Sequence, residues 1–122
     1  MVLGFKKQFV PKILDGAKIH TIREDKTRRW KKGMEIHFAT GVRTKDYDQF
    51  KGGECTMVQE IKMNPSTGEV LVERHGQFFP LSDYYKAKLI EQDGFDSEDE
   101  FWEWFNEPFE GVLIHWTNYF YA

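Results

Sequence analysis

The segment from residue 55 to residue 74 limits the possible folds more than any other part of the chain. Two runs rich in apolar and β-branched residues, 55–63 and 69–74, flank the five residues NPSTG at 64–68. Proline and glycine preset the backbone dihedrals of a turn, and strand-like runs on both sides of such a turn are typical of a β-hairpin. The sequence therefore predicts an antiparallel hairpin in the middle of the chain.

Several other segments are expected to be strands, and few helices separate them. Residues 34–38 alternate apolar and polar side chains with the period of a strand, and further strands are expected at 2–5, 17–23 and 112–121. The polar stretch 41–53 is expected to be a long loop. Because most strands follow one another without a helical crossover, a doubly wound parallel sheet is disfavoured. The expected fold class is α+β: a small, mostly antiparallel β-barrel with flanking short helices.

Three short helices are expected from the residues at their ends. A helix at 8–15 carries its proline in the first turn, where the missing N–H costs little, and a glycine follows its last residue. Helices at 82–92 and 97–105 each begin with a serine, a preferred N-cap residue. The second serine is followed three residues later by a glutamate, which is the capping-box pattern.

Length and composition indicate one domain spanning residues 1–122. The lone Cys55 cannot form an intramolecular disulfide, which favours a reducing compartment. No apolar run approaches the roughly 20 residues of a membrane helix, and no apolar signal core precedes the first charges. We therefore expect a cytoplasmic protein without a membrane partner.

Most common catalytic and cofactor motifs are absent from the sequence. The four histidines do not pair with one another or with Cys55 at metal-site spacings, so no metal is expected. Neither a glycine-rich phosphate loop nor a nucleophile elbow occurs, and no cofactor is expected. Cys55 lies in an expected strand, which favours a small core residue over a nucleophile.

The net charge of −3 conceals an uneven distribution along the chain. Residues 1–52 hold 13 Lys and Arg against 6 Asp and Glu, whereas residues 53–122 hold 4 against 14. A basic half can form a surface that faces nucleic acid. The alternative is a solvated surface whose two halves attract each other across the fold. Both interpretations remain open from the sequence.

Two aromatic segments also allow two interpretations each. The cluster 101–105 could stack on bases, but its helical spacing favours core packing, with Trp102 facing outward. In the basic stretch 26–32, Arg29 and the other cations could follow phosphates while Trp30 stacks on a base. The alternative, which we favour, is that Trp30 anchors this loop where the next strand begins.

The segment ILDGAKIHTIR at residues 13–23 is the most informative motif. An apolar helix ends at a glycine, and a strand carrying Lys18, Thr21 and Arg23 follows. The later segments WKKGMEIHF at 30–38, EQDGFDSEDEF at 91–101 and VLIHW at 112–116 follow in a matching order. Together they resemble the ASCH domain family of the PUA-like superfamily, over nearly the whole chain.

This resemblance implies a PUA-like β-barrel with a cleft on one side and a role in binding RNA or modified nucleosides. One branch of the family is similar to small amidohydrolases that remove the acyl group of N4-acetylcytidine. By position, the catalytic set of that branch corresponds to Lys18, Thr21 and, in place of a glutamate, Asp93. The resemblance thus implies that these three residues lie in one cleft.

The chemistry of these residues is plausible without the family. A threonine hydroxyl needs an adjacent base, and a lysine can serve when burial or a neighbouring cation lowers its pKa. Arg23 could supply that cation or bind a phosphate or carbonyl oxygen. Because Lys18 and Thr21 are three residues apart, both can face one cleft only if Lys18 lies on the turn or a bulge intervenes.

Two functions from different classes follow, and the sequence also leaves a third open. The first is an RNA-, nucleotide- or nucleoside-binding module whose ligand contacts Lys18, Thr21, Arg23 and Asp93, with Arg29 and Trp30 as further candidates. The second is an amidohydrolase with Lys18, Thr21 and Asp93 as catalytic residues. The third is a protein-interaction domain that uses the acidic aromatic helix at 97–105.

Overall fold

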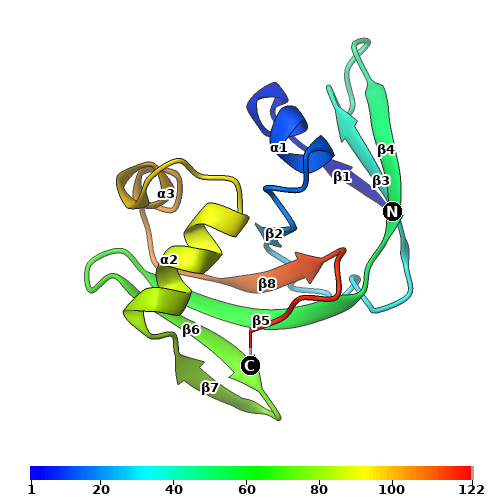
Figure 1. Ribbon diagram of the computed structural model, residues 1–122. Coiled ribbons are helices and arrows are strands. Elements are labelled where there is room, and N and C mark those ends of the chain that lie inside the picture. The colour runs from blue at the N-terminus through cyan, green and yellow to red at the C-terminus, as the bar shows by residue number, and fades with distance from the viewer. Residues whose placement is uncertain (122) are drawn as a thin grey trace.

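The computed structural model describes residues 1–121 of the chain, which form short helices around two β-sheets (Figure 1). The elements in chain order are β1 (Val2–Gly4), the 3-10 helix η1 (Lys7–Phe9), α1 (Val10–Leu14), β2 (His20–Arg23), β3 (Glu35–Thr40), β4 (Asp48–Glu54), β5 (Met57–Asn64), β6 (Glu69–Arg74), β7 (Gln77–Pro80), α2 (Asp83–Gln92), α3 (Glu98–Trp104) and β8 (Phe109–His115).

The strands form one sheet of three strands and one of five. The first has the order β1-β3-β4, in which β1 runs parallel to β3 and β4 antiparallel. The second has the order β2-β8-β5-β6-β7 and is antiparallel throughout. Figure 1 shows α1 beside the three-stranded sheet and α2 and α3 over the five-stranded sheet. The α+β class with mostly antiparallel sheets is thus confirmed.

The expected closed barrel is not found among residues 1–121. β1 and β2 are edge strands of different sheets and share no backbone ladder. Instead, the side chain of Arg23 crosses from β2 to β1, where Nη2 donates a hydrogen bond to the Gly4 carbonyl at 2.6 Å. A side-chain hydrogen bond, and not a backbone ladder, therefore links these two edge strands.

The predicted hairpin is confirmed, but the prediction of a long loop at 41–53 is wrong. β5 and β6 pair antiparallel around the turn at 64–68, as expected. Residues 48–54 form β4, which pairs with β3 despite a polar and glycine-containing sequence of low strand propensity. The strand forms because the aromatic ring of Phe50 packs against Phe5 and Phe38 in the core, and this contact outweighs the low strand propensity. The sequence also does not predict β7, because its last residue is Pro80 and a proline is unfavourable within a strand.

The helices lie close to their expected positions and have the expected caps. Ser82 accepts a hydrogen bond from the Tyr85 backbone N–H at 3.3 Å, and Ser97 accepts one from Glu100 at 3.1 Å. The expected helix at 8–15 is divided between η1 and α1. The last strand begins at Phe109 and ends at His115, earlier at both ends than expected.

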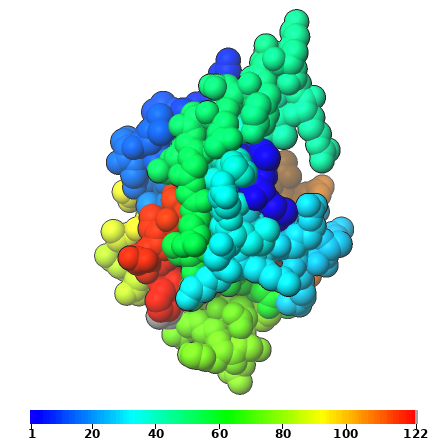
Figure 2. All heavy atoms as spheres, turned by 90° about the vertical axis from the view of Figure 1, so that its right-hand side faces the viewer, coloured from blue at the N-terminus to red at the C-terminus, as the bar shows by residue number. Residues whose placement is uncertain are grey.

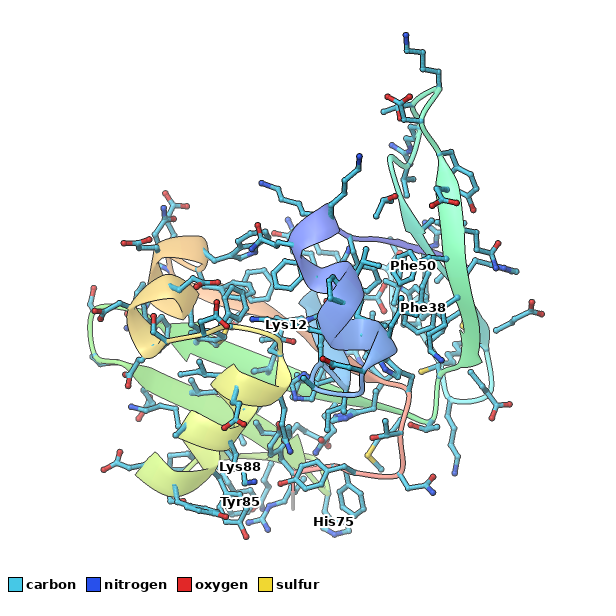
Figure 3. All side chains as sticks on the ribbon, turned by 45° about the horizontal axis from the view of Figure 1, so that its top comes forward. Lys12, Phe38, Phe50, His75, Tyr85 and Lys88 are labelled. Carbon is cyan, nitrogen blue, oxygen red and sulfur yellow. The ribbon has the colours of Figure 1, made fainter. Side chains whose placement is uncertain are left out.

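Aromatic side chains join the elements into one core. Where the two sheets meet, the ring of Phe38 contacts Phe5, Phe50 and Trp116, and Figure 3 labels Phe38 and Phe50 together beside α1. A second aromatic cluster joins η1 to α3 and the segment before it, and consists of Phe9, Phe95, Phe101, Trp104 and Phe105. The first cluster fixes β1 and the second fixes η1, so both support the site between them. Within residues 1–121, no helix is long and apolar enough to cross a membrane.

Candidate functional site

The turn after α1 brings Lys18 to the site. Gly16, with φ of +86°, reverses the chain after the helix, a conformation that favours glycine. The Lys18 backbone N–H donates to the Lys12 carbonyl at 2.9 Å, and the Ile19 N–H donates to the Gln92 carbonyl at 2.9 Å. Lys18 therefore precedes β2, which begins at His20. This is the turn position that allows Lys18 and Thr21 to face the same cleft.

Asp93 reaches the same place from the end of α2. It is the C-cap residue, and its backbone N–H donates to the Leu89 carbonyl at 2.9 Å. Gly94 follows with φ of +94°, and a Cβ at this position would lie 3.0 Å from Lys18 Cδ and 3.1 Å from Phe9 Cδ1. A glycine is therefore required both for the backbone conformation and for the close packing of Lys18 against the helix end.

Lys18 and Asp93 form a buried ion pair. Each residue is only 2% exposed. Lys18 Nζ donates to the Asp93 carbonyl oxygen at 2.5 Å and to Oδ1 at 3.2 Å, and it lies 5.0 Å from the centre of the Phe9 ring. Burial lowers the pKa of Lys18, and the Asp93 carboxylate partly offsets this effect. The site therefore contains a lysine that is a weaker base than an exposed lysine.

Thr21 and Arg23 face the site from β2. They are two residues apart on a strand and therefore share a face. Arg23 Nε donates to Thr21 Oγ1 at 3.2 Å, and the guanidinium carbon lies 4.9 Å from the centre of the Phe5 ring. Burial lowers the pKa of Arg23, but a guanidinium remains charged at neutral pH. Thr21 is thus a hydroxyl held beside a fixed cation.

These four residues line one cleft of about 410 Å³ between β1, β2 and the helices. The complete lining consists of Gly4, Phe5, Lys6, Phe9, Lys18, Thr21, Ile22, Arg23, Asp93, Phe95, Trp104 and Phe105. Aromatic rings thus form much of the wall, and the polar groups of Lys18, Thr21, Arg23 and Asp93 converge in it. Small-molecule sites commonly have this size and this combination of apolar walls with a few polar groups.

Three polar groups in the cleft have hydrogen-bonding capacity that no other group of residues 1–121 uses. Both side-chain contacts of Asp93 are made by Oδ1, so Oδ2 is unpaired. Arg23 uses Nε and Nη2, so Nη1 is unpaired, and Thr21 accepts a hydrogen bond but donates none. Neither Oδ2 nor Nη1 is sealed from open space. The cleft therefore offers one carboxylate acceptor and two donors to a ligand.

A second layer of hydrogen bonds lies behind Asp93. His20 Nδ1 is 3.0 Å from Asp93 Oδ1, and its Nε2 is 2.6 Å from the Tyr121 hydroxyl. The Tyr121 hydroxyl is also 2.8 Å from Gln92 Oε1. His20 is fully buried, and burial lowers its pKa. Neither His20 nor Tyr121 is predictable as part of the site from the sequence, because one histidine in a strand and one distant tyrosine form no recognisable pattern.

Arg29 and Trp30 do not line this cleft. They belong to the loop 24–33, which lies beside the N-terminal strand in Figure 2. Asp25 holds this loop, accepting hydrogen bonds from the backbone N–H of Arg29 at 2.8 Å and of Trp30 at 2.9 Å. Trp30 is partly buried against the core, as expected for an anchor. The structure therefore separates these two predicted ligand-binding residues from the other four.

The two oppositely charged halves of the chain contact each other directly. Lys12 Nζ is 2.6 Å from Asp96 Oδ1 and donates to the Gly94 carbonyl at 2.6 Å, and Figure 3 shows Lys12 on the side of α1 toward the end of α2. With the Lys18–Asp93 pair, this contact joins the turn after α1 to the end of α2. Part of the charge asymmetry is therefore used to assemble the cleft.

The aromatic segment 101–105 differs from expectation at its tryptophans. Trp104, expected to pack in the core, is 43% exposed and lines the cleft, where Lys6 Nζ lies 5.0 Å from its ring. Trp102 is only partly exposed, and its indole N–H donates to Glu98 at 3.3 Å. The prediction that Trp102 is the outward-facing residue is therefore wrong. Helical periodicity gave the buried face, but it could not predict that the cleft would open beside Trp104.

Other chemistry finds little support in the described residues. Residues 1–121 contain no cluster of three or more His, Cys, Asp or Glu side chains that could hold a metal ion. Cys55 is buried, and burial raises the pKa of its thiol, which disfavours a reactive thiolate. A second hollow, of about 470 Å³, lies near Trp30, but its charged lining is of both signs and includes the surface pair Arg28–Glu60.

Comparison with known proteins finds no matching family model, no matching curated protein and no matching solved structure.

Proposed function

We propose that the cleft binds a planar heterocycle: the base of a nucleoside, of a nucleotide or of an unpaired RNA segment. One observation carries this proposal, namely that aromatic rings and unpaired polar groups face the same cleft. Stacking of a base on an aromatic side chain contributes about 1–3 kcal/mol. The unpaired acceptor on Asp93 and donors on Thr21 and Arg23 match the mixed donor and acceptor edges of bases.

The resemblance to the ASCH family supports the same proposal from the sequence. Four residues that this resemblance and local chemistry single out, Lys18, Thr21, Arg23 and Asp93, line the cleft together. We further propose that the two sheets are an opened version of a PUA-like barrel, with the cleft at the gap between β1 and β2. The free thiol of Cys55 supports a cytoplasmic location.

Isothermal titration calorimetry with the four common ribonucleosides, their 5′-monophosphates and N4-acetylcytidine tests the proposal. We expect saturable binding of at least one of these compounds. Thr21→Val, which removes the hydroxyl at nearly constant volume, should weaken binding of that compound about tenfold. Arg29→Ala removes a cation outside the cleft and serves as the matched control. If none of the compounds binds, or if both variants weaken binding equally, the proposal is wrong.

A short single-stranded RNA distinguishes the free ligand from the polymer. An RNA that contacts several cations loses affinity steeply as the salt concentration rises, whereas an uncharged nucleoside does not. If RNA binds more tightly than the best nucleoside and shows this salt dependence, the biological ligand is the polymer. If RNA does not compete with a bound nucleoside, the cleft is a small-molecule site.

A second candidate function is hydrolysis of an acylated amine on such a base. The lowered pKa of Lys18 favours it, because loss of the ammonium proton, after which the amine can accept a proton from the Thr21 hydroxyl, is easier than for an exposed lysine. The Thr21 oxygen would attack the acyl carbonyl, and the released amine would leave with a proton from Lys18. Water would then hydrolyse the threonine ester and release acetate. Arg23, already donating to Thr21 Oγ1, would stabilise negative charge on the attacking oxygen.

Release of acetate from N4-acetylcytidine tests this second function. An enzyme should lose turnover in Lys18→Met and in Thr21→Val. A binding module should bind the compound without turnover in any of the three proteins. The binding function is the better supported, because Lys18 makes both of its hydrogen bonds to Asp93 and none to Thr21.

A further inference from the structure

The hydrogen bonds behind the cleft define how the carboxylate of Asp93 is oriented. Oδ1 receives hydrogen bonds from two directions, from Lys18 Nζ at 3.2 Å and from the His20 ring at 3.0 Å. These two contacts fix the plane of the carboxylate, and a half-turn about the Cβ–Cγ bond only exchanges its two equivalent oxygens. Because both contacts use one oxygen, the other oxygen is left for the cleft. His20 helps to hold the carboxylate in this orientation, and it does not itself line the cleft.

The position of His20 separates it from the ligand. It is fully buried and does not line the cleft. The groups that face it are Asp93 and Lys18 on one side, and Tyr121 and His115 on the other. His20 therefore acts on a ligand only through Asp93.

We propose that His20 is a positioning residue, which donates from Nδ1 to Asp93 and is itself oriented by the Tyr121 hydroxyl, so that Asp93 Oδ2 faces the ligand. The role in binding rests on the function proposed above. The orientation of the ring does not, because it follows from contacts within the protein alone.

The proton inventory selects one tautomer of His20. The Asp93 carboxylate is an acceptor, so a neutral His20 must carry its proton on Nδ1. Nε2 is then an acceptor, and the Tyr121 hydroxyl donates a hydrogen bond to it. In the structure the Tyr121 hydroxyl donates to Gln92 Oε1 at 2.8 Å. The proposed arrangement requires the Gln92 amide to be turned by a half-rotation, so that its nitrogen donates to the Tyr121 oxygen and the hydroxyl donates to His20 Nε2; the exchange leaves the shape of the amide nearly unchanged. Burial, which lowers the pKa of His20, supports the neutral ring.

Long-range proton–nitrogen correlation spectra of uniformly labelled protein test the tautomer directly, without any ligand. We expect the His20 ring to be a neutral Nδ1–H tautomer at neutral pH. This tautomer reports the hydrogen bond from Nδ1 to Asp93, and the effect of that bond on a ligand is tested separately by the variants below. An Nε2–H tautomer, or an imidazolium form near pH 7, would overturn the proposed arrangement.

Three variants test the effect on the nucleoside that binds most tightly. His20→Asn retains an N–H donor near the position of Nδ1, whereas His20→Leu retains volume and loses the donor. We expect His20→Asn to stay within about threefold of wild-type affinity and His20→Leu to lose tenfold or more. Tyr121→Phe should lose threefold or more, and Tyr119→Phe, which removes a hydroxyl outside the relay, should have no effect. Near-UV circular dichroism identifies any variant that does not fold.

The outcomes separate the two proposals. If wild type binds no nucleoside but His20 is the Nδ1–H tautomer, the proposed function fails and the arrangement of the ring stands. If wild type binds and the asparagine and leucine variants of His20 lose equal affinity, the positioning role is wrong and the proposed function stands.

Discussion

Replacement of Asp93 by asparagine should destabilise the fold far more than the same change at the surface. The carboxylate compensates the buried charge of Lys18, and both side chains are only 3% exposed. Removing one partner of such a pair typically costs about 3–5 kcal/mol, because the remaining charge stays buried without compensation. Asparagine has nearly the same shape, so cavity formation adds little to this cost.

Urea unfolding followed by tryptophan fluorescence measures this cost, and Glu60→Gln is the matched control. Glu60 pairs with Arg28 at 3.2 Å, a similar distance, but these side chains are 41% and 81% exposed. Exposed pairs contribute at most about 1 kcal/mol. With an m-value near 1.5 kcal/mol per molar urea, a loss of 3 kcal/mol moves the midpoint by about 2 M.

The double variant Lys18→Met/Asp93→Asn identifies the cause of the loss. If the uncompensated charge of Lys18 is responsible, removing that charge should recover part of the stability lost in Asp93→Asn. Two results would refute this explanation. Asp93→Asn could cost no more than Glu60→Gln, or the loss in the double variant could equal the sum of the losses in Lys18→Met and Asp93→Asn measured separately.

Three further predictions follow from single contacts. Burial lowers the pKa of His115 from 6.5 to about 3, so the unfolded chain binds the additional proton between these values. Stability should therefore decrease as the pH is lowered, by roughly 2–3 kcal/mol from this residue between pH 7 and pH 4.5, and urea unfolding of His115→Gln should show a correspondingly smaller loss; an equal acid loss would contradict the shift. Gly94→Ala should lower both the thermal midpoint and nucleoside affinity, because its Cβ would contact Lys18 at 3.0 Å, whereas Gly76→Ala, with positive φ but open space, should lower only the midpoint. Arg29→Ala should leave the calorimetric affinity for a nucleoside within twofold of wild type, because Arg29 does not line the cleft, and a loss as large as that of Thr21→Val would contradict the assignment of the site to the cleft.

The sequence predicted those elements whose formation depends on residues close to them in the chain. The turn at 64–68 and the serine caps of α2 and α3 each depend on residues within one turn of the element. β4 could not be predicted in this way, because its formation depends on Phe50 meeting Phe5 and Phe38, which come from other strands. The expected closed barrel is not found, and no local pattern shows that the Arg23 side chain reaches Gly4 between the two edge strands.

Only the residues of the candidate site that belong to the recognised motifs could be predicted from the sequence. The sequence brought Lys18, Thr21 and Arg23 together within six residues, and the resemblance added Asp93. It could not show that Arg29, only six residues after Arg23, belongs to a separate loop held by Asp25. The aromatic wall and the His20 relay depend on contacts across as many as 101 residues of sequence, for which one chain carries no signal.

Mapping of amide chemical-shift changes during titration with the tightest-binding nucleoside tests the central claim most directly. We predict that the largest changes lie in residues 4–9, 18–23 and 93–95, together with the Trp104 indole signal. Changes concentrated in the loop 24–33, or the absence of any saturable change with nucleosides, nucleotides and short RNA, would contradict it.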